Sequence, residues 1–158
     1  MSKIEKVLAT GKTHTTFSDA TRTHGKLDIE LSSPGNAKPA HVFAATQPHP
    51  TAEQLFAGAW SACYTAAVGL VAGEMNVVLP SDLSVDIEVD LGQTGPAYFL
   101  QARLPLRVPG LPHDIATTLA HTADQICPYS KATRGNICLL YTSPSPRDAT
   151  LSRMPSSA

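Results

Sequence analysis

The feature that most constrains the fold is a long segment without charge, residues 56–72, which is rich in alanine and glycine. Its length is near the lower limit for a helix that crosses a bilayer, but a membrane span is usually richer in leucine and isoleucine. Just before it, Thr51 offers an N-cap, and Gln54 three positions later completes a capping-box pattern. We therefore expect a buried helix over about residues 52–72 of a soluble protein, with no membrane as a partner.

Two segments after this helix alternate apolar and polar residues with the period of a β-strand. Residues 83–92 have aliphatic side chains on one face and three acidic residues on the other: Asp86, Glu88 and Asp90. Residues 98–108 follow a turn signal and carry Arg103 and Arg107 on their polar face. The pattern predicts a hairpin whose acidic and basic residues meet on its solvent side. Because Pro105 has no N–H to donate, we also expect a free strand edge there.

The rest of the pattern predicts an α+β fold. A second helix is expected to begin near Pro112 and to end before Pro128. Cys127 would then lie in its last turn. Alternating residues predict further strands at residues 1–16, 26–32 and, less regularly, 41–45. This order of elements, with a closing strand after Ile137, indicates a mainly antiparallel sheet rather than βαβ winding.

The chain of 158 residues fits one domain, which we place at residues 1–137. Residues 138–158 lose the alternation and become rich in serine, proline and arginine, which is typical of a disordered tail. The run LLYTSPSPRD also resembles a translated sequencing-adapter read. On that interpretation, the tail is a sequencing or assembly artefact that replaces the last strand of the native protein.

Composition argues against several classes of partner. The net charge of -1 and the scattered histidines give no electrostatic footprint for nucleic acid or anionic lipid. The N-terminal run MSKIEKVLATGKTHTT lacks the apolar core and the cleavage site of a secretory signal, so we expect a cytoplasmic protein. His41 and His49 have no Cys, Asp or Glu partner at ligand spacing, and no metal site is expected.

The cysteines suggest chemistry rather than structural cross-linking. Cys63, Cys127 and Cys138 are too few for a secreted disulfide framework and form no CxxC or zinc-type cluster. Small residues around Cys63 let another helix approach its backbone, which would bring Cys127 within disulfide distance. The residues alone leave open that both are ordinary buried thiols, because free cysteine is often buried and inert.

The two thiols stand in characteristic contexts, EQLFAGAWSACY around Cys63 and CPYSKATRGNI from Cys127. They occur with KIEKVLATGKTHTT, GKLDIELSSPG and VDIEVDLGQTGPAYFLQARLPLRVPGL. This combination resembles the organic hydroperoxide resistance proteins, the Ohr branch of the OsmC/Ohr family of thiol peroxidases, over most of residues 3–137. The resemblance implies an OsmC-like antiparallel sheet packed on a long central helix and a second helix. It also implies an intertwined homodimer with each active site at the subunit interface.

The resemblance assigns roles to three residues. It implies that Cys63 is the peroxidatic cysteine, that Cys127 is the resolving cysteine, and that Glu53 orients a catalytic arginine over the thiolate. A cation is needed because the thiolate is the nucleophile, and a nearby guanidinium lowers the pKa of the thiol and polarises the peroxide. Buried without that cation, Cys63 is expected to stay protonated and inert.

The arginine is where the chain departs from the family pattern. Members usually carry a GGRDG-type loop between the first two strands, whereas this chain reads TTFSDATRTHGKL. Arg22 is the only arginine in that loop and is the candidate activator of the thiolate, with a solvated loop residue as the alternative. Arg134 is the next candidate, although its segment reads as structural support. Lys26 is a weaker one, because an ammonium lacks the planar fork of arginine.

The resemblance therefore predicts a cytoplasmic thiol peroxidase that reduces organic or fatty-acid hydroperoxides, in defence against oxidative stress. It implies a dithiol reductant, namely lipoyl groups of lipoylated proteins, and no bound cofactor. One alternative is the OsmC branch, with a different range of peroxides. Another is a non-catalytic, redox-responsive binding protein of the same fold, in which the pKa of Cys63 would lie near the free value of about 8.5. A third is a truncated product that folds poorly.

Overall fold

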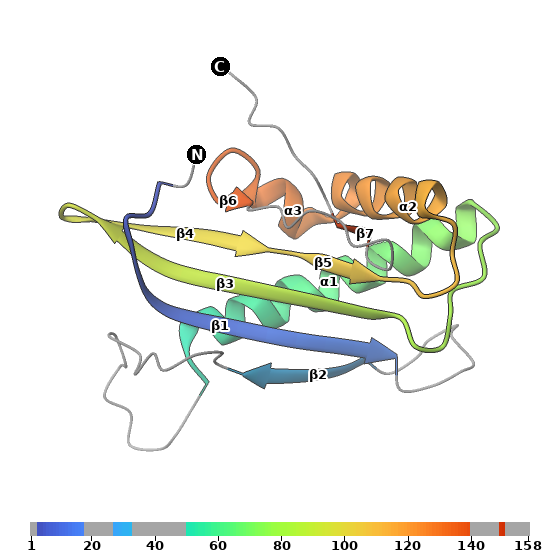
Figure 1. Cartoon of the computed structure of the whole chain (residues 1–158), viewed down its shortest axis with the longest axis horizontal. Coiled ribbons are helices and arrows are strands. Elements are labelled where there is room, and N and C mark those ends of the chain that lie inside the picture. The colour runs from blue at the N-terminus through green and yellow to red at the C-terminus, as the bar shows by residue number, and fades with distance from the viewer. Residues whose placement is uncertain (1–2, 18–26, 33–49, 140–148, 151–158) are drawn as a thin grey trace.

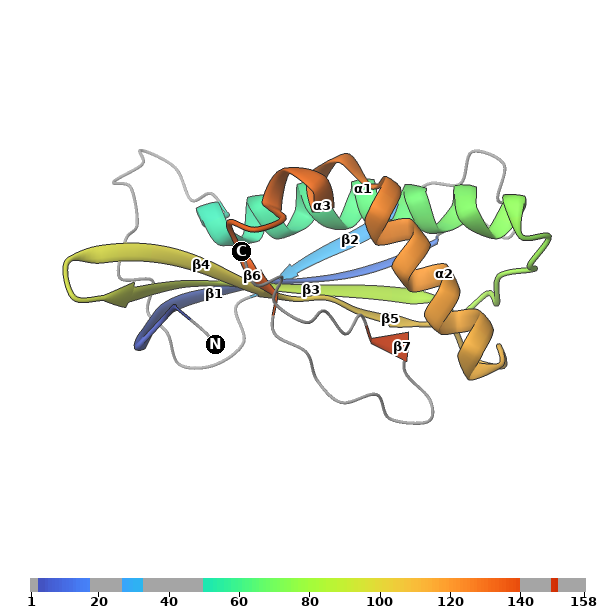
Figure 2. The ribbon, with the colours of Figure 1, turned by 90° about the horizontal axis from the view of Figure 1, so that it is seen from above.

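The computed structural model describes residues 3–17, 27–32, 50–139 and 149–150. One sheet joins the strands of these residues, which are β1 (Lys6–Phe17), β2 (Leu27–Ser32), β3 (Ser84–Thr94), β4 (Ala97–Arg103), β5 (Pro105–Arg107), β6 (Cys138–Leu139) and β7 (Ala149–Thr150). The helices are α1 (Ala52–Glu74), α2 (His113–Ile126) and α3 (Pro128–Thr133). The helices cover one face of the sheet, and the fold is α+β as predicted (Figures 1 and 2).

The sheet is antiparallel except for one short pair. Its strand order is β2-β1-β3-β4-β6, and β5 pairs with both β3 and β7. Only β4 and β6 run parallel among the described strands. The predicted hairpin is confirmed as β3 and β4, with Glu88 opposite Arg103 and Asp90 opposite Gln101.

The helix α1 forms the centre of the hydrophobic core. It packs mainly on β1 and β3 and buries its largest side chains completely: Trp60, Tyr64, Val68 and Val71. The predicted capping box is confirmed, since Thr51 and Gln54 each accept a hydrogen bond from the backbone of the other. By length and composition α1 is able to cross a membrane, but 50% of its most apolar window is buried inside the protein. It is therefore a core helix, as the alanine-rich sequence predicts.

The corner between α2 and α3 differs in part from the prediction. α2 begins at His113, with Pro112 as its N-cap, and Cys127 is its C-cap. Pro128 follows, and it begins a second short helix, α3, which the sequence analysis missed. Proline suits the first turn of a helix because the N–H that it lacks has no partner there in any case. Cys127 consequently lies at the junction of two helices.

The polar face of the hairpin is less exposed than predicted. Asp86 and Asp90 of β3 are only 4% and 2% exposed. Asp90 is covered because three neighbouring side chains bind it: Thr10, Gln101 and Arg103. The acidic and basic residues do meet on this face as predicted, but two of the carboxylates lie beneath their partners instead of in solvent.

The expectation of a free edge at Pro105 is wrong. Pro105 lies opposite Thr150 and Leu106 lies opposite Ala149, so β5 is covered by β7. After Ile137, β6 pairs with β4 beside Gln101 and Ala102. The tail at 138–158 as an artefact, and the domain boundary at 137, stay predictions. The expected irregular strand at residues 41–45 lies outside the described residues.

Candidate functional site

The structure brings the two predicted thiols into contact. The Sγ atoms of Cys63 and Cys127 are 3.4 Å apart, and the Cys127 thiol donates toward Cys63. Both cysteines are free, and Cys127 is completely buried while Cys63 is partly exposed. A disulfide requires the two sulfur atoms to move to about 2.05 Å, so the rearrangement needed is small.

The backbone on both sides of Cys127 is held by regular hydrogen bonds. Its N–H donates to the carbonyl of Ala123 in α2, and its carbonyl accepts from the N–H of Lys131 in α3. Small residues on α2 allow its close approach to α1, because Ala120 and Ala123 are almost completely buried there. The expectation that a second helix would bring Cys127 close to Cys63 is confirmed, and the small buried residues at this approach belong to α2.

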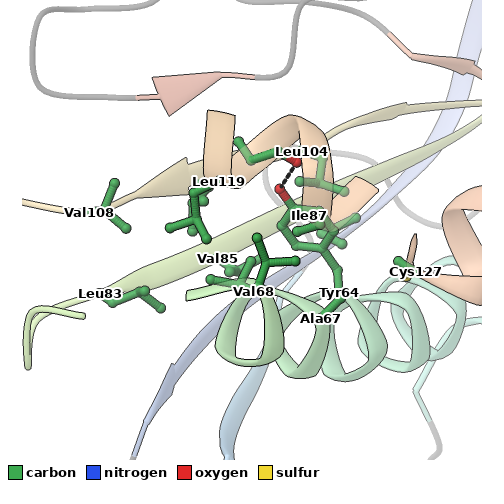
Figure 3. Close-up of a cluster of buried hydrophobic side chains, with 14 of the residues drawn as sticks. Tyr64, Ala67, Val68, Leu83, Val85, Ile87, Leu104, Val108, Leu119 and Cys127 are labelled. Atoms are coloured by element: carbon green, nitrogen blue, oxygen red, sulfur yellow. Dashed lines mark hydrogen bonds between the residues drawn. The ribbon is translucent and has the colours of Figure 1, made fainter. Parts of the chain in front are cut away.

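Two side-chain hydrogen bonds flank the pair of thiols, and the sequence analysis identified neither of them. The indole Nε1 of Trp60 donates to Ser130 Oγ at 3.0 Å. The hydroxyl of Tyr64 donates to the carbonyl of Ala120 at 3.0 Å, shown by the dashed line in Figure 3. A signal was available in the placement of the only tryptophan beside Cys63, since a buried indole N–H needs an acceptor.

Burial dominates the electrostatics of Cys63 and raises the pKa of its thiol. A hydrogen bond from the backbone of Tyr129 opposes this shift, and the neighbouring Cys127 adds to it. Burial, with the charges of Asp124 and Cys127, also raises the pKa of Tyr64 well above its usual value. Among the described residues, no cation lowers the pKa of Cys63. In these surroundings the protonated thiol is favoured.

Glu53 lies in the first turn of α1, ten residues before Cys63 in the same helix, and is 8% exposed. Strand β1 passes close to this turn at Gly11. A Cβ built on Gly11 would collide with the backbone N of Gln54 and the backbone C of Glu53. Only glycine permits so close an approach, so Gly11 determines how the turn that carries Glu53 sits on the sheet.

Of the three cations predicted as candidates near Cys63, only Arg134 lies within the described residues. Arg22 and Lys26 lie outside the described residues, so the assignment of Arg22 as activator stays a prediction. Arg134 donates from Nη2 to the carbonyl oxygen and to Oδ2 of Asp124, each at 3.2 Å. That contact ties the end of α3 to α2, which agrees with a supporting role for Arg134.

No cluster of metal-ligating side chains occurs within the described part of the chain. His41 and His49 lie outside it. The chemistry that the described site offers is that of two adjacent thiols in an apolar environment, one of them accessible and one enclosed. Such a pair is suited to a cycle of oxidation to a disulfide and reduction by an external thiol.

The family model described as OsmC-like protein matches residues 45–139. The organic hydroperoxide resistance protein of Xanthomonas axonopodis pv. citri (strain 306) is 36% identical over 145 residues, which are 90% of this chain and 99% of that protein. The organic hydroperoxide resistance protein OhrA of Bacillus subtilis (strain 168) is 31% identical, over 70% of this chain and 76% of its own.

Solved structures of organic hydroperoxide resistance proteins also resemble this chain. The organic hydroperoxide resistance protein OhrB of Bacillus subtilis superposes with a TM-score of 0.56 at 27% identity, over 80% of this chain and 93% of that one. An organic hydroperoxide resistance protein from Elizabethkingia anophelis superposes with a TM-score of 0.55 at 26% identity, over 88% and 95% of the two chains.

Proposed function

Because this chain belongs to the family of OsmC-like proteins, and its relatives in that family are named organic hydroperoxide resistance proteins, we propose that it is a thiol peroxidase that protects against organic hydroperoxides. The observation that carries the proposal is the 3.4 Å contact between the Sγ atoms of Cys63 and Cys127. A thiol pair at this distance supports a reaction in which one sulfur is oxidised and the other resolves it.

In the first step, the Cys63 thiolate attacks the terminal oxygen of the hydroperoxide. The O–O bond breaks, the alkoxide leaves and takes up a proton to become an alcohol, and Cys63 becomes a sulfenic acid. The Cys127 sulfur then attacks the Cys63 sulfur. An S–S bond forms, the S–O bond breaks, and the hydroxyl leaves as water with the proton of the Cys127 thiol.

Activation of Cys63 is the demanding step, because burial raises the pKa of this thiol. We assign the missing cation to Arg22, oriented by Glu53, because the family resemblance places an arginine above the thiolate. A guanidinium in hydrogen-bond reach of the sulfur would lower the pKa again and polarise the peroxide. The burial of Glu53 supports this assignment, since a carboxylate enclosed to this extent requires a partner.

The cycle ends when an external dithiol reduces the disulfide, and we assign this role to lipoyl groups of lipoylated proteins in the cytoplasm. We also propose that the chain is a homodimer. The outward side of α1 carries exposed apolar residues, among them Leu55 and Leu70, which are 54% and 59% exposed. Apolar exposure on the central helix supports a second copy of the chain as its cover.

The proposal is tested with purified protein, cumene hydroperoxide and dihydrolipoamide. Cys63→Ser is expected to abolish turnover, whereas Cys127→Ser should complete the first step and accumulate a sulfenic acid that dimedone traps. Cys138→Ser, which changes the remaining cysteine, is the matched control and should keep its activity. Unchanged turnover in Cys63→Ser would rule out the mechanism.

A non-catalytic, redox-responsive protein is a second candidate, favoured by the raised pKa of Cys63. The pH dependence of Cys63 alkylation by iodoacetamide separates the two. An activated peroxidase has an alkylation midpoint below the free value of about 8.5, and a redox-responsive thiol has one at or above it. Relative rates with hydrogen peroxide and bulky organic peroxides distinguish the Ohr branch from the OsmC branch.

A further inference from the structure

We propose that Trp60 and Tyr64 are positioning residues that hold Cys127 against Cys63 for the formation of the disulfide. The inference deepens the proposed function and rests on it for its biological meaning. Neither residue contacts the reacting peroxide in this scheme. Each instead fixes one of the two helices that meet at Cys127.

We call Trp60 and Tyr64 the anchors, and their hydrogen bonds lie on either side of the contact between Cys63 and Cys127. Trp60 precedes Cys63 by three residues on α1 and bonds Ser130, which follows Cys127 by three residues in α3. Tyr64 is adjacent to Cys63 and bonds the carbonyl of Ala120, two turns before Cys127 in α2. α1 therefore holds α3 on one side of the corner and α2 on the other.

The corner needs such anchors because its backbone is not continuous helix. Cys127 has φ -60° and ψ 120°, an extended conformation between α2 and α3. The extended backbone of Cys127 leaves the angle between the two helices to side-chain contacts, one of which is the Arg134–Asp124 ion pair between α3 and α2. The two hydrogen bonds to α1 add what that ion pair does not provide: they hold the corner against the helix that carries Cys63.

The anchors lie where water does not compete for them. Trp60 and Tyr64 are completely buried, and Ser130 is 2% exposed. When one partner of a buried hydrogen bond is removed, the other is left buried without a partner, which costs free energy. The packed position of the helix corner against α1 is then less favourable than a displaced one. We therefore expect the two hydrogen bonds to fix the position of Cys127 relative to Cys63, in addition to any effect on the free energy of unfolding.

The consequence concerns the fate of the Cys63 sulfenic acid. A well-placed Cys127 converts it to a disulfide and water. A displaced Cys127 leaves time for a second hydroperoxide to transfer its terminal oxygen to Cys63, which yields a sulfinic acid and a second alcohol. Holding two reacting groups in place raises the rate of their reaction without changing either group.

The first test does not depend on peroxidase activity. The Cys63–Cys127 disulfide is equilibrated with glutathione redox buffers in the wild type, Ser130→Ala and Tyr64→Phe. Each variant loses one anchor and should lower the effective concentration of the thiol pair about tenfold, the equivalent of one net hydrogen bond. Thr118→Ala is the control, because it removes a hydroxyl of α2 that bonds the Asp114 carbonyl at an exposed position. This control should leave the equilibrium unchanged.

The second test separates the two chemical steps. In single-turnover reactions with cumene hydroperoxide, the anchor variants should form sulfenic acid at the wild-type rate and disulfide about tenfold more slowly. Mass spectrometry should then find more sulfinic acid at Cys63 as the peroxide concentration rises. If both steps slow equally, the residues act only on general stability, and the proposal is wrong.

A double-mutant cycle covers the case in which a variant folds poorly. Trp60→Phe keeps a large aromatic ring and removes the indole donor. Combined with Ser130→Ala, it should weaken the thiol pair no further than either change alone, because both remove the same bond. Additive losses, or an unchanged glutathione equilibrium in every anchor variant, would overturn the proposal. An inactive wild type with the predicted equilibrium shifts would reject the peroxidase function and retain the positioning role.

Discussion

On the outer face of the sheet, Arg103 binds both oxygens of Asp90 at 2.8 and 3.0 Å and donates to Glu88 at 2.7 Å. On the inner face, under α1, the hydroxyls of Thr15 and Ser61 bond each other, and the thiols of Cys63 and Cys127 make contact. The outer polar groups are charged and paired with opposite charge. These inner hydroxyls and thiols carry no opposite charge as a partner and bond one another in an apolar environment.

The comparison shows where the described cations are engaged. Lys12 pairs with Glu88, Arg103 with Asp90 and Glu88, and Arg134 with Asp124. Lys12 and Arg103 are engaged on the outer face, and Arg134 is engaged by Asp124 between α3 and α2. Among the described residues, no cation lowers the pKa of Cys63, and Arg22 stays the proposed activator. The described residues of the inner face position the two thiols in an apolar environment, and none of them is a cation that lowers the pKa of Cys63.

The largest expected effect comes from removing the central cation of the outer face. Arg103→Met leaves the buried carboxylate of Asp90 without its main partner, which should reduce the free energy of unfolding by about 3 kcal/mol. Urea denaturation measures this change. Arg107→Met, at an exposed position on β5, is the control and should have a small effect. A loss as small as that of the control would show that the outer charges do not stabilise the sheet.

A smaller effect is expected from Gly11→Ala on the inner face. The new Cβ would meet backbone atoms of Glu53 and Gln54, and these cannot move as a flexible side chain does. We expect a loss of about 2 kcal/mol and a displaced first turn of α1. Peroxidase activity should fall with it if Glu53 orients the catalytic cation.

The control for Gly11→Ala is Gly73→Ala, which has no atom within 4 Å of the added Cβ. That change should stabilise α1 by about 0.5 kcal/mol, because alanine favours a helix over glycine. Equal effects of the two substitutions would contradict the close contact between β1 and α1.

The smallest effect is a difference in how the two faces respond to pH. Burial alone would raise the pKa of Asp90, but hydrogen bonds from Arg103, Thr10 and Gln101 outweigh it and bring the pKa below its usual 3.8. The stability that Asp90 contributes is therefore present above pH 3.8 and is lost as pH falls through the lower, folded-state value. On the inner face, burial raises the pKa of Tyr64, so its contribution is lost as pH rises instead.

Midpoints of urea denaturation measured across the pH range give both the loss of stability at acid pH, the acid limb, and the loss at alkaline pH, the alkaline limb. Arg103→Met should flatten the acid limb and leave the alkaline limb in place, whereas Tyr64→Phe should flatten only the alkaline limb. If Arg103→Met changes both limbs alike, the two faces are not electrostatically separate.

Much of the fold follows from local patterns in the sequence. The capping box at Thr51 and the alternation of residues 83–92 predict α1 and β3, because side-chain period and cap chemistry are local properties. The burial of Asp86 and Asp90 could not be predicted in this way, since it depends on side chains of neighbouring strands. Local alternation cannot distinguish a solvent face from one that its own salt bridges cover.

The candidate site shows the same limit. Sequence resemblance pointed to Cys63 and Cys127, and the packing of α1 against α2 and α3 places their sulfur atoms together. The anchors at Trp60 and Tyr64 could not be predicted, because their acceptors lie in distant segments whose approach depends on the crossing of helices. The proposed role of Arg22 rests on the resemblance and on the burial of Glu53.

The unequal exposure of the two sulfur atoms also makes the pair directional. Cys127 is enclosed by the corner of the helices, whereas Cys63 is accessible from outside. An incoming thiolate must approach a disulfide along the S–S axis, and of the two cysteines Cys63 is the more exposed one. In the proposed cycle, the mixed disulfide with the dithiol therefore forms on Cys63, and Cys127 departs as the leaving group.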